Sequence, residues 1–309
     1  MSNPVVSVLM PAFNAEQFIG SAIESILSQS FTDFELIVLS DGSTDRTSSV
    51  VRQFTDPRII LIESKDNAGL VIVRNRLVAM ARGRYIAFLD ADDTAMPHRL
   101  QTQVDYLDRM QVDICGGSYV SFYEATGKIK ASKQRYTDAD IRALLTISSP
   151  LCNPAIMGRA EVFKRFPYQA GKDYAEDYSL WVAIALAGYR FVNLKEKLIT
   201  YRIHSTQTSQ TQNTKTNAIF LQSREEYLIG LGIPPKWTPV PMGILKRLTF
   251  ALPFMFLLNQ KIRGISVSAN YEIYARFQYR GNGLLTPLTR LERLLAAILG
   301  SLKGGSLRG

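Results

Sequence analysis

The stretch VVSVLMPAFNAEQFIGSAIESILSQSFTDFELIVLSDG, residues 5–42, decides the fold. Residues 5–10 and 34–39 are short apolar runs rich in β-branched side chains, which is typical of buried strands. Between them, residues 16–27 place their apolar side chains at helical spacing. A strand, a helix and a second strand in this order predict two parallel strands joined by a crossover helix.

The same alternation continues along the next part of the chain. Its pattern predicts a helix over residues 44–54, a strand over 59–63, a helix over 70–81 and a strand over 85–89. The strands are continuously apolar rather than alternating, so we expect both faces of the sheet to be covered. The predicted fold class is therefore α/β, with a mostly parallel sheet flanked by helices. Such sheets bind ligands beyond the carboxyl ends of their strands.

Beyond residue 100 the pattern is looser. A pair of strands is predicted over residues 112–122, and a short helix over 138–146. Residues 178–187 predict a longer helix, which an acidic pair precedes. Residues 205–217 are rich in Ser, Thr, Gln and Asn and predict a loop.

Composition narrows the class of protein. The chain has 309 residues, of which 46% are hydrophobic and 20% charged, so it is long and apolar enough for one large or two smaller cores. Its two cysteines, Cys115 and Cys152, form no CxxC pair, which argues against a disulfide framework and a zinc knuckle. The N-terminus has no basic segment leading into a long apolar stretch. We therefore expect a protein without a secretory signal, in a reducing, cytoplasmic compartment.

An acidic cluster follows the strand predicted over residues 85–89. The sequence Asp90-Ala91-Asp92-Asp93 places three carboxylates within four residues, where they repel each other. A divalent cation would relieve that repulsion, because hard cations take oxygen ligands. The alternative is an acidic loop that caps the helix predicted over residues 97–110. The acidic cluster lies at a strand end and faces Asp41 at the end of another strand, which favours the cation site.

A second polar motif, Asp41-Gly42-Ser43-Thr44-Asp45, follows the second strand. Thr44 or Asp45 can cap the helix that comes next. Asp41 lies too early for capping. Its carboxylate can instead accept hydrogen bonds from a ribose or a base.

Three segments together resemble the family 2 glycosyltransferases of the GT-A fold. They are SVLMPAFNAEQFIGSAIESILSQSFTDFELIVLSDGSTDRT (residues 7–47), NAGLVIVRN (67–75) and GRYIAFLDADD (83–93). The resemblance extends from about Val6 to about Ser209. It implies a metal-dependent enzyme of the bacterial polysaccharide or lipopolysaccharide type. Such an enzyme transfers a sugar, most often from a UDP-linked donor, to an acceptor hydroxyl with inversion of the anomeric centre.

The resemblance also implies roles for individual residues. Those matching the nucleotide side of the family's site are Pro11, Ala12, Phe13, Asp41, Arg74 and Asp90. Asp92 matches the acid that binds Mn²⁺ or Mg²⁺ held by the donor diphosphate, and His204 matches a histidine found near that metal. A surface or packing role for His204 is an equal alternative. Ser40 departs from the family, which frequently has a second acid at that position.

The Glu176-Asp177 pair matches the family's Glu-Asp motif. An inverting displacement needs a general base to take the proton of the acceptor hydroxyl, and the resemblance assigns that role to Asp177, supported by Glu176. The alternative is that two acids in a first helical turn only complement the helix dipole.

The C-terminal part of the chain is basic. Residues 241–309 contain ten Lys or Arg and two Glu, so they carry +8 of the net +9. The apolar run at residues 248–258 is too short to cross a bilayer core of about 30 Å. With Lys246, Arg247, Lys261 and Arg263 beside it, the run predicts an interfacial helix on an anionic leaflet, and residues 291–299 offer a second amphipathic piece. The alternative is a helical subdomain packed on the catalytic domain.

We therefore expect a catalytic domain over residues 1–215 and a helical region over 216–309. Within the helical region, residues 241–309 are expected to contact the membrane peripherally. The expected partners are a nucleotide-sugar donor and a saccharide or lipid-linked saccharide acceptor. A nucleotidyltransferase would have a Gly-rich basic loop after its first strand, which MPAFNAEQF lacks. A non-catalytic scaffold would not need the carboxylates of Asp92 and Asp177. A dehydrogenase would show GxGxxG, and no nucleic-acid-binding module is recognised, so we expect no nucleic-acid partner.

Overall fold

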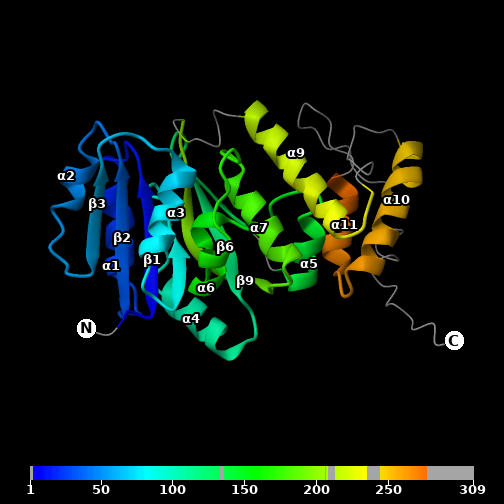
Figure 1. Ribbon diagram of the computed structural model, residues 1–309, viewed down its shortest axis with the longest axis horizontal. Coiled ribbons are helices and arrows are strands. Elements are labelled where there is room, and N and C mark those ends of the chain that lie inside the picture. Colours follow the sequence, from blue (N-terminus) through cyan, green and yellow to red (C-terminus); the bar gives the residue numbers. More distant parts are fainter. Residues whose placement is uncertain (1–2, 133–135, 206, 208–212, 235–243, 277–309) are drawn as a thin grey trace. The chain divides into compact units, whose positions relative to one another are not determined.

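The computed structural model describes residues 3–132, 136–205, 207, 213–234 and 244–276 (Figure 1). The chain forms two compact units. The first unit consists of Met1–Arg135 and Leu151–Phe220, and the second of Tyr136–Pro150 and Leu221–Gly309. The second unit therefore includes a short segment that lies far from it in the sequence.

Four parallel strands form one half of the first unit's sheet. They are β1 (Val6–Ala12), β2 (Phe34–Asp41), β3 (Ile59–Ser64) and β4 (Tyr85–Phe88). Their order is β3-β2-β1-β4 (Figure 1). Helices α1 (Ile19–Leu27), α2 (Thr47–Val51) and α3 (Leu70–Met80) connect them. The chain crosses from β3 back to the other side of β1, so β1 and β4 form the topological switch point at which such sheets bind ligands.

Both faces of β1, β2 and β4 are covered, as the continuous apolar runs predict, whereas β3 is only partly buried. Every residue of β2 is buried, and β1 is buried except for Pro11. Helix α1 shows why the crossover packs well, because its side chains at positions i, i+3, i+4 and i+7 face the sheet. Those residues, all 0% exposed, are Ile19, Ala22, Ile23 and Ile26.

Strand β1 continues past Pro11, although proline removes a backbone donor. The pairing of β1 with β4 ends at Leu9 and Phe88, whereas its pairing with β2 continues to Ala12 and Ser40. Pro11 therefore lies where only one neighbouring strand is present. Strand β1 therefore ends at Ala12, two residues later than the sequence pattern predicts.

The other half of the sheet is mixed. It contains β5 (Thr94–Ala95), β6 (Ile114–Tyr123), β7 (Lys128–Ala131), β8 (Met157–Arg159) and β9 (Phe191–Ile203). Strand β8 is antiparallel to β4 and β6, and β9 is parallel to β6 and antiparallel to β5. The helices of this half are α4 (Arg99–Arg109), the short 3₁₀ helix η1 (Asn153–Ala155), α6 (Ala160–Arg165) and α7 (Glu176–Leu186).

The prediction of two strands over residues 112–122 is wrong, because this segment is the single long strand β6. Its Gly116-Gly117 pair makes no turn. A Cβ atom at Gly117 would lie 2.5 Å from Leu198 Cδ1, so glycine here allows β9 to approach closely. The register between the two strands is irregular at this point.

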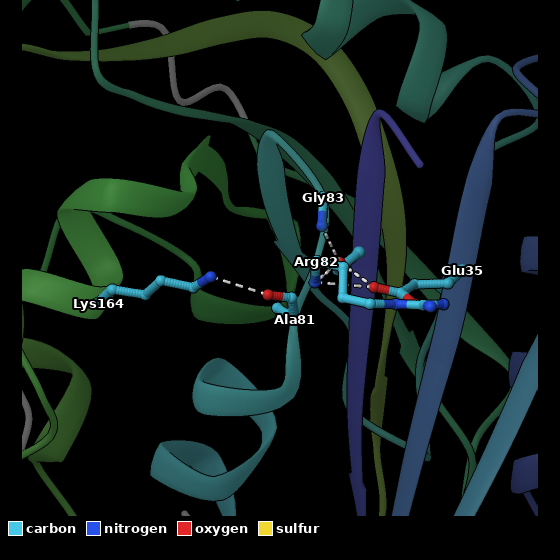
Figure 2. A network of polar contacts seen from close by, with 6 residues as sticks. Glu35, Ala81, Arg82, Gly83 and Lys164 are labelled. Atoms are coloured by element: carbon cyan, nitrogen blue, oxygen red, sulfur yellow. Dashed lines mark hydrogen bonds and ion pairs between the residues drawn. The ribbon is translucent and has the colours of Figure 1, made fainter. Parts of the chain in front are cut away.

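A buried carboxylate fixes the N-terminal ends of the parallel strands β1 and β2 (Figure 2). Glu35 of β2 accepts hydrogen bonds from Ser7 Oγ of β1 at 2.6 Å and from the Arg82 N–H at 2.9 Å. The Arg82 guanidinium donates to the second oxygen of Glu35 at 2.6 Å, and the Gly83 N–H donates to Ser7 Oγ at 2.8 Å. Lys164 Nζ of α6 donates to the Ala81 carbonyl at 2.9 Å. These contacts hold the turn from α3 into β4, and thus the strand that ends at the acidic cluster.

We predict that Glu35→Gln destabilises the first unit by about 1.5–3 kcal/mol, the range for a hydrogen bond to a charged group. The denaturant midpoint measures this loss. Arg82→Gln should cost less, because the Arg82 side chain is 57% exposed and its backbone N–H still donates. Burial raises the pKa of Glu35, but the hydrogen bonds from Ser7 and Arg82 outweigh burial and lower it. The stabilisation is therefore present at neutral pH and is lost as the pH falls through this lowered pKa. Equal midpoints for wild type and Glu35→Gln would contradict the prediction.

Helices build the second unit. It contains α5 (Asp138–Leu144), the larger part of α9 (Asn213–Gly230), α10 (Ile244–Lys261) and α11 (Val267–Arg276). The loop predicted over residues 205–217 thus ends earlier than expected, since α9 begins at Asn213. Asn217 is exposed in this helix, so its polar side chain faces solvent without interrupting the helix.

The apolar run at residues 248–258 lies in α10 and supplies the core of the second unit. Four of its side chains, Ala251, Phe254, Met255 and Leu258, are 0% exposed. They share a cluster with residues of α5, α9 and α11. This is the packing that the helical-subdomain alternative predicts for the run, and it leaves Phe256 as an exposed large apolar side chain of α10. Residues 291–299 lie outside the described residues. No helix within the described ranges is long and apolar enough to span a bilayer.

The predicted α/β class with a helical C-terminal region is confirmed.

Candidate active site

The residues predicted to hold the nucleotide begin at the end of β1. Ala12 is buried, Pro11 is partly buried, and the ring of Phe13 is 51% exposed. Asn14 follows with a left-handed φ of 48°. Its side-chain oxygen accepts the Thr44 N–H at 2.9 Å, which ties the loop after β1 to the loop after β2. An exposed aromatic ring beside a fixed loop can stack on a planar ligand.

Asp41, at the end of β2, has a structural partner that the sequence did not reveal. Its carboxylate accepts the N–H groups of Ala68 and Gly69 at 3.0 Å each, and it is only 4% exposed. The next residue, Gly42, has a φ of 65°, and a Cβ atom there would lie 2.5 Å from the Asn67 nitrogen. Asp41 and Gly42 therefore dock the loop that precedes α3.

Ser40 occupies the position where the family frequently has a second acid. Its hydroxyl donates to the hydroxyl of Ser43, in the loop after β2, at 3.0 Å. Ser43 Oγ in turn accepts the Asn14 N–H at 3.2 Å. Ser40 thus ties the end of β2 to the loop that follows it.

The acidic cluster lies directly after β4. Carboxylate oxygens of Asp90, Asp92 and Asp93 all lie within 4.8 Å of one another. Asp93 is 1% exposed; its Oδ1 accepts the Arg202 N–H at 2.8 Å, and its Oδ2 has no hydrogen-bond partner among the described residues. Burial, with the nearby charges of Asp92 and Asp90, raises the pKa of Asp93 well above its ordinary value. Burial likewise raises the pKa of Asp90, to about 6, against the opposing charge of Arg74.

A buried arginine behind the cluster holds the end of β4. Arg99 of α4 is 1% exposed, and its guanidinium donates to the carbonyls of Phe88 at 2.7 Å and Ile156 at 3.2 Å. One turn later, Gln103 donates to the carbonyls of Cys115 and Ala155. The acidic loop therefore starts from a strand end that α4 fixes in place.

The end of β9 contacts the acidic cluster from another direction. His204 Nε2 lies 3.0 Å from Asp92 Oδ2, and Arg202 Nε donates to the Asp92 carbonyl at 3.0 Å. The ring of Phe18 lies 4.8 Å from the His204 ring, and the Arg202 guanidinium lies 5.0 Å from the Phe18 ring. The two residues predicted to bind metal, Asp92 and His204, are thus brought together although 112 positions separate them.

Arg74 joins the acidic cluster to the predicted catalytic pair. Its guanidinium forms an ion pair with Glu176 and a second, at 3.4 Å, with Asp90. Arg74 is 5% exposed and lies 5.5 Å from the ring of Tyr168. Burial lowers the pKa of Arg74, but the surrounding negative charge, chiefly that of Glu176, outweighs burial and raises the pKa above its ordinary value. The arginine therefore stays charged. One buried cation therefore faces two carboxylates from distant parts of the chain.

Asp177 lies in the first turn of α7, next to Glu176. Its Oδ1 accepts the Tyr178 N–H at 2.6 Å. Burial and the charge of Glu176 raise the pKa of Asp177 to about 6, while Arg74 opposes the shift. Because Glu176 is paired with Arg74, Asp177 is the acid of the two that is better able to accept a proton.

The acidic cluster fits a divalent cation. Its ligands are carboxylate oxygens, which suit Mg²⁺ and Mn²⁺, and the buried Asp93 Oδ2 lacks a partner among the described residues. Among the described residues, the ion pairs of these three carboxylates are those of Asp90 with Arg74 and of Asp92 with His204. A cation here would compensate for the charge repulsion that raises the pKa values of Asp90 and Asp93.

Sequence reasoning missed Arg99, Tyr168 and Arg202. Arg202 had a signal, because it lies two residues before His204 on one strand, and alternate residues of a strand share a face. Arg99 and Tyr168 had none. A buried arginine in an amphipathic helix and a tyrosine in a loop acquire a role only through contacts made by the folded chain.

Comparison with known proteins identifies the family to which the chain belongs. A family model described as "Glycosyl transferase family 2" matches residues 7–166. An uncharacterised glycosyltransferase of Haemophilus influenzae is 34% identical over 250 residues, which cover 75% of this chain and 77% of that protein. The chain belongs to glycosyl transferase family 2.

One relative and two solved structures extend the comparison. WfaP of Escherichia coli, named a UDP-Glc:alpha-D-GlcNAc-diphosphoundecaprenol beta-1,3-glucosyltransferase, is 31% identical over 66% of this chain and 80% of its own. The S. aureus TarS structure in complex with UDP-GlcNAc has a TM-score of 0.60 at 16% identity, covering 95% of this chain and 88% of that one. A mannosyltransferase from Pyrobaculum calidifontis in complex with GDP-Man and Mn²⁺ has a TM-score of 0.50 at 18% identity, covering 88% and 75%. The fold is the GT-A fold, as predicted.

Proposed function

We propose that this glycosyltransferase moves a sugar from a UDP-linked donor to an acceptor hydroxyl with inversion, in the assembly of cell-surface polysaccharide on a lipid-linked acceptor. The observation that carries the proposal is the Arg74 bridge, which holds the acidic cluster after β4 next to the Glu176-Asp177 pair of α7. Donor chemistry and proton removal must occur within one site, and this bridge connects groups suited to each. The names of WfaP and TarS support the donor and the acceptor class.

On the nucleotide side, we assign base stacking to Phe13 and the adjoining contacts to Pro11 and Ala12. Asp41 acts by shaping the loop before α3 as well as through its remaining acceptor capacity toward the ribose or base. Asp90 contributes negative charge at the end of β4, and Arg74 contributes positive charge from within the protein.

A divalent cation, Mn²⁺ or Mg²⁺, would be held by Asp92 with support from Asp90, Asp93 and His204. When bound, it neutralises the negative charge that builds up on the departing diphosphate. The protein's own contribution is to hold the ligands. The Arg202 N–H donates to the Asp93 carboxylate, the Arg202 side chain donates to the Asp92 carbonyl, and Arg99 fixes the end of β4.

On the acceptor side, Asp177 takes the proton of the attacking hydroxyl. Its raised pKa makes it a stronger base than an ordinary aspartate, yet it is still ionised at neutral pH. Glu176 supports Asp177 indirectly, because its ion pair with Arg74 fixes the first turn of α7.

A screen of nucleotide sugars tests the proposal. The full chain is incubated with Mn²⁺ and each of the common UDP-, GDP- and dTDP-sugars, and the release of nucleoside diphosphate is measured. We expect slow hydrolysis of one UDP-sugar and faster release with the right acceptor. Release of pyrophosphate would favour a nucleotidyltransferase, and no turnover or binding of any nucleotide sugar would favour a non-catalytic scaffold.

We also propose peripheral contact of residues 241–309 with an anionic leaflet, carried by their charge rather than by the buried apolar run. Lys261 and Arg263 are exposed at the end of α10. Each basic residue near such a surface contributes about 1 kcal/mol, so Lys261→Gln with Arg263→Gln should weaken binding to phosphatidylserine vesicles roughly 30-fold. Sedimentation at low salt measures this.

The double variant is preferable to a truncation near residue 240, which would remove Phe254 and Leu258 from the core of the second unit. Lys128→Gln with Lys130→Gln, on the exposed strand β7, is the matched control and should sediment like the wild type. A wild-type chain that does not sediment with anionic vesicles at low salt would exclude membrane contact.

A further inference from the structure

A pocket lies beside α7, apart from the residues assigned above. It has a volume of about 430 Å³ and is open to solvent. Its lining residues are Gly171, Asp173, Tyr174, Ala218 and Ile219. The first three belong to the loop that leads into α7, and the last two to the first part of α9. All five lie within the first unit.

The two walls of the pocket are joined directly. Tyr178 of α7 and Phe220 of α9 have ring centroids 4.3 Å apart, and Phe220 follows the lining residue Ile219. At the base of the loop, the Ala175 N–H donates to the Lys172 carbonyl at 3.2 Å. The pocket therefore has fixed sides and is more than a gap between unconnected segments.

Tyr174 has a backbone conformation that tyrosine rarely adopts. Its φ is 73°, in the left-handed region, where a side chain with a Cβ is strained. Glycine would be free of this strain, as it is at Gly171, whose φ is 78°. The ring of Tyr174 is nonetheless 38% exposed, and it lines the pocket. A strained backbone that presents an exposed aromatic ring at a pocket indicates a binding role.

The lining suits a saccharide. A pyranose has an apolar C–H face, which packs on an aromatic ring, and a rim of hydroxyl groups, which donate to a carboxylate. Tyr174 offers the ring and Asp173 the carboxylate, with Ala218 and Ile219 as apolar wall. Few polar groups set among apolar ones are the usual composition of a small-molecule site.

We propose that this pocket binds the saccharide of the acceptor, with Tyr174 and Asp173 as its specificity-determining residues. The inference rests on the proposed function, in which Asp177 takes the proton of the acceptor hydroxyl. Tyr174 precedes Asp177 by three residues, so their Cα atoms are at most about 11 Å apart. The residues assigned to the donor instead follow β1, β2 and β4. A saccharide in this pocket therefore lies on the side of the base.

Two variants of Tyr174 separate the ring from the backbone, and a variant of Asp173 tests the carboxylate. Tyr174→Gly removes the ring and relieves the backbone strain, and its denaturant midpoint shows whether the chain stays folded. Tyr174→Phe keeps the ring, and Asp173→Asn keeps the shape of the carboxylate without its charge. With the donor and acceptor found in the screen, we expect Tyr174→Gly to raise the acceptor KM at least about tenfold, the scale of a lost pocket contact. Its donor KM should be unchanged, and Tyr174→Phe should stay within a few-fold of wild type.

A binding experiment tests the pocket independently of the proposed function. Saturation-transfer NMR of the full chain with a panel of methyl hexopyranosides and methyl N-acetylhexosaminides needs neither donor nor metal. We expect at least one glycoside to bind the wild type and Tyr174→Phe, to lose binding in Tyr174→Gly, and to remain bound when UDP and Mn²⁺ are added. Absence of binding to the wild type, undiminished binding to Tyr174→Gly, or displacement by UDP would overturn the proposal. A failed donor screen would count against the proposed function alone.

Discussion

Asp177→Asn is expected to lower the turnover of sugar transfer by about 100-fold or more, the contribution typical of a general base. The substitution keeps the size of the side chain and its place in the first turn of α7, but asparagine cannot accept the acceptor's proton. Because the residues assigned to the nucleotide lie outside α7, nucleotide binding should persist. Single-turnover rates and a nucleotide titration on the same protein separate the two effects.

Two control variants define what this result means. Glu161→Gln removes an exposed acid from the first turn of α6, so it measures the cost of losing a favourable charge at a helix N-terminus. It should leave transfer unchanged. Glu176→Gln breaks the ion pair with Arg74 and should reduce stability as well as turnover. Normal turnover in Asp177→Asn together with a large loss in Glu176→Gln would mean that Glu176 is the base.

The pH profile of wild type should reflect the same group. Burial and the charge of Glu176 raise the pKa of Asp177 to about 6, and only the ionised carboxylate accepts a proton. Turnover should therefore be constant above this pH and decrease below it, approaching tenfold per pH unit. This acidic limb should be missing from the residual activity of Asp177→Asn. An ordinary aspartate would place the limb near pH 4.

Asp92→Asn is expected to lower Mn²⁺-dependent release of nucleoside diphosphate at least about 100-fold, because it removes the charge of the carboxylate that we propose as a metal ligand. Chelation by excess EDTA should abolish wild-type activity, and added Mn²⁺ or Mg²⁺ should restore it. Arg202→Gln removes the guanidinium that donates to the Asp92 carbonyl and lies over the Phe18 ring, and should weaken Mn²⁺ binding about 10–100-fold, as outer contacts of metal sites do. Electron paramagnetic resonance of free Mn²⁺ measures both affinities.

Asp105→Asn is the matched control for this series, since Asp105 is an exposed acid of α4 that accepts a hydrogen bond from Gln101. It should bind Mn²⁺ like the wild type. Full activity of the wild type in excess EDTA would show that the acidic cluster does not act through a metal.

Much of this site could be predicted because its residues follow apolar strands. A parallel sheet brings the carboxyl ends of its strands to one edge, so Phe13, Asp41 and Asp90 had to lie near one another once β1, β2 and β4 were recognised. The C-terminal half of the first unit offers no such rule. The proximity of His204 to Asp92 depends on how β9 crosses the sheet, and only the family resemblance indicated it.

The errors have a common physical origin. Apolarity shows that a segment is buried, but not against what, so the run at residues 248–258 suited both a leaflet and a protein core. Its partners include residues of α5 and α9, more than 20 residues away in the sequence, as well as residues of α11. The segment predicted as two strands is the single strand β6, and its Gly117 lets β9 approach closely. The role of Arg74 as a bridge required three distant segments to be folded together.

The central claim is that Asp177 activates the acceptor for a single displacement at the sugar's anomeric carbon, opposite the departing nucleotide. Proton NMR of the transfer reaction, or of slow donor hydrolysis, tests it most directly by following the first anomer that appears from an α-linked UDP-sugar. We expect the β anomer first, with the α anomer arising only later by mutarotation of the free sugar. An α product from the first turnover, or a sugar covalently attached to the protein, would contradict it.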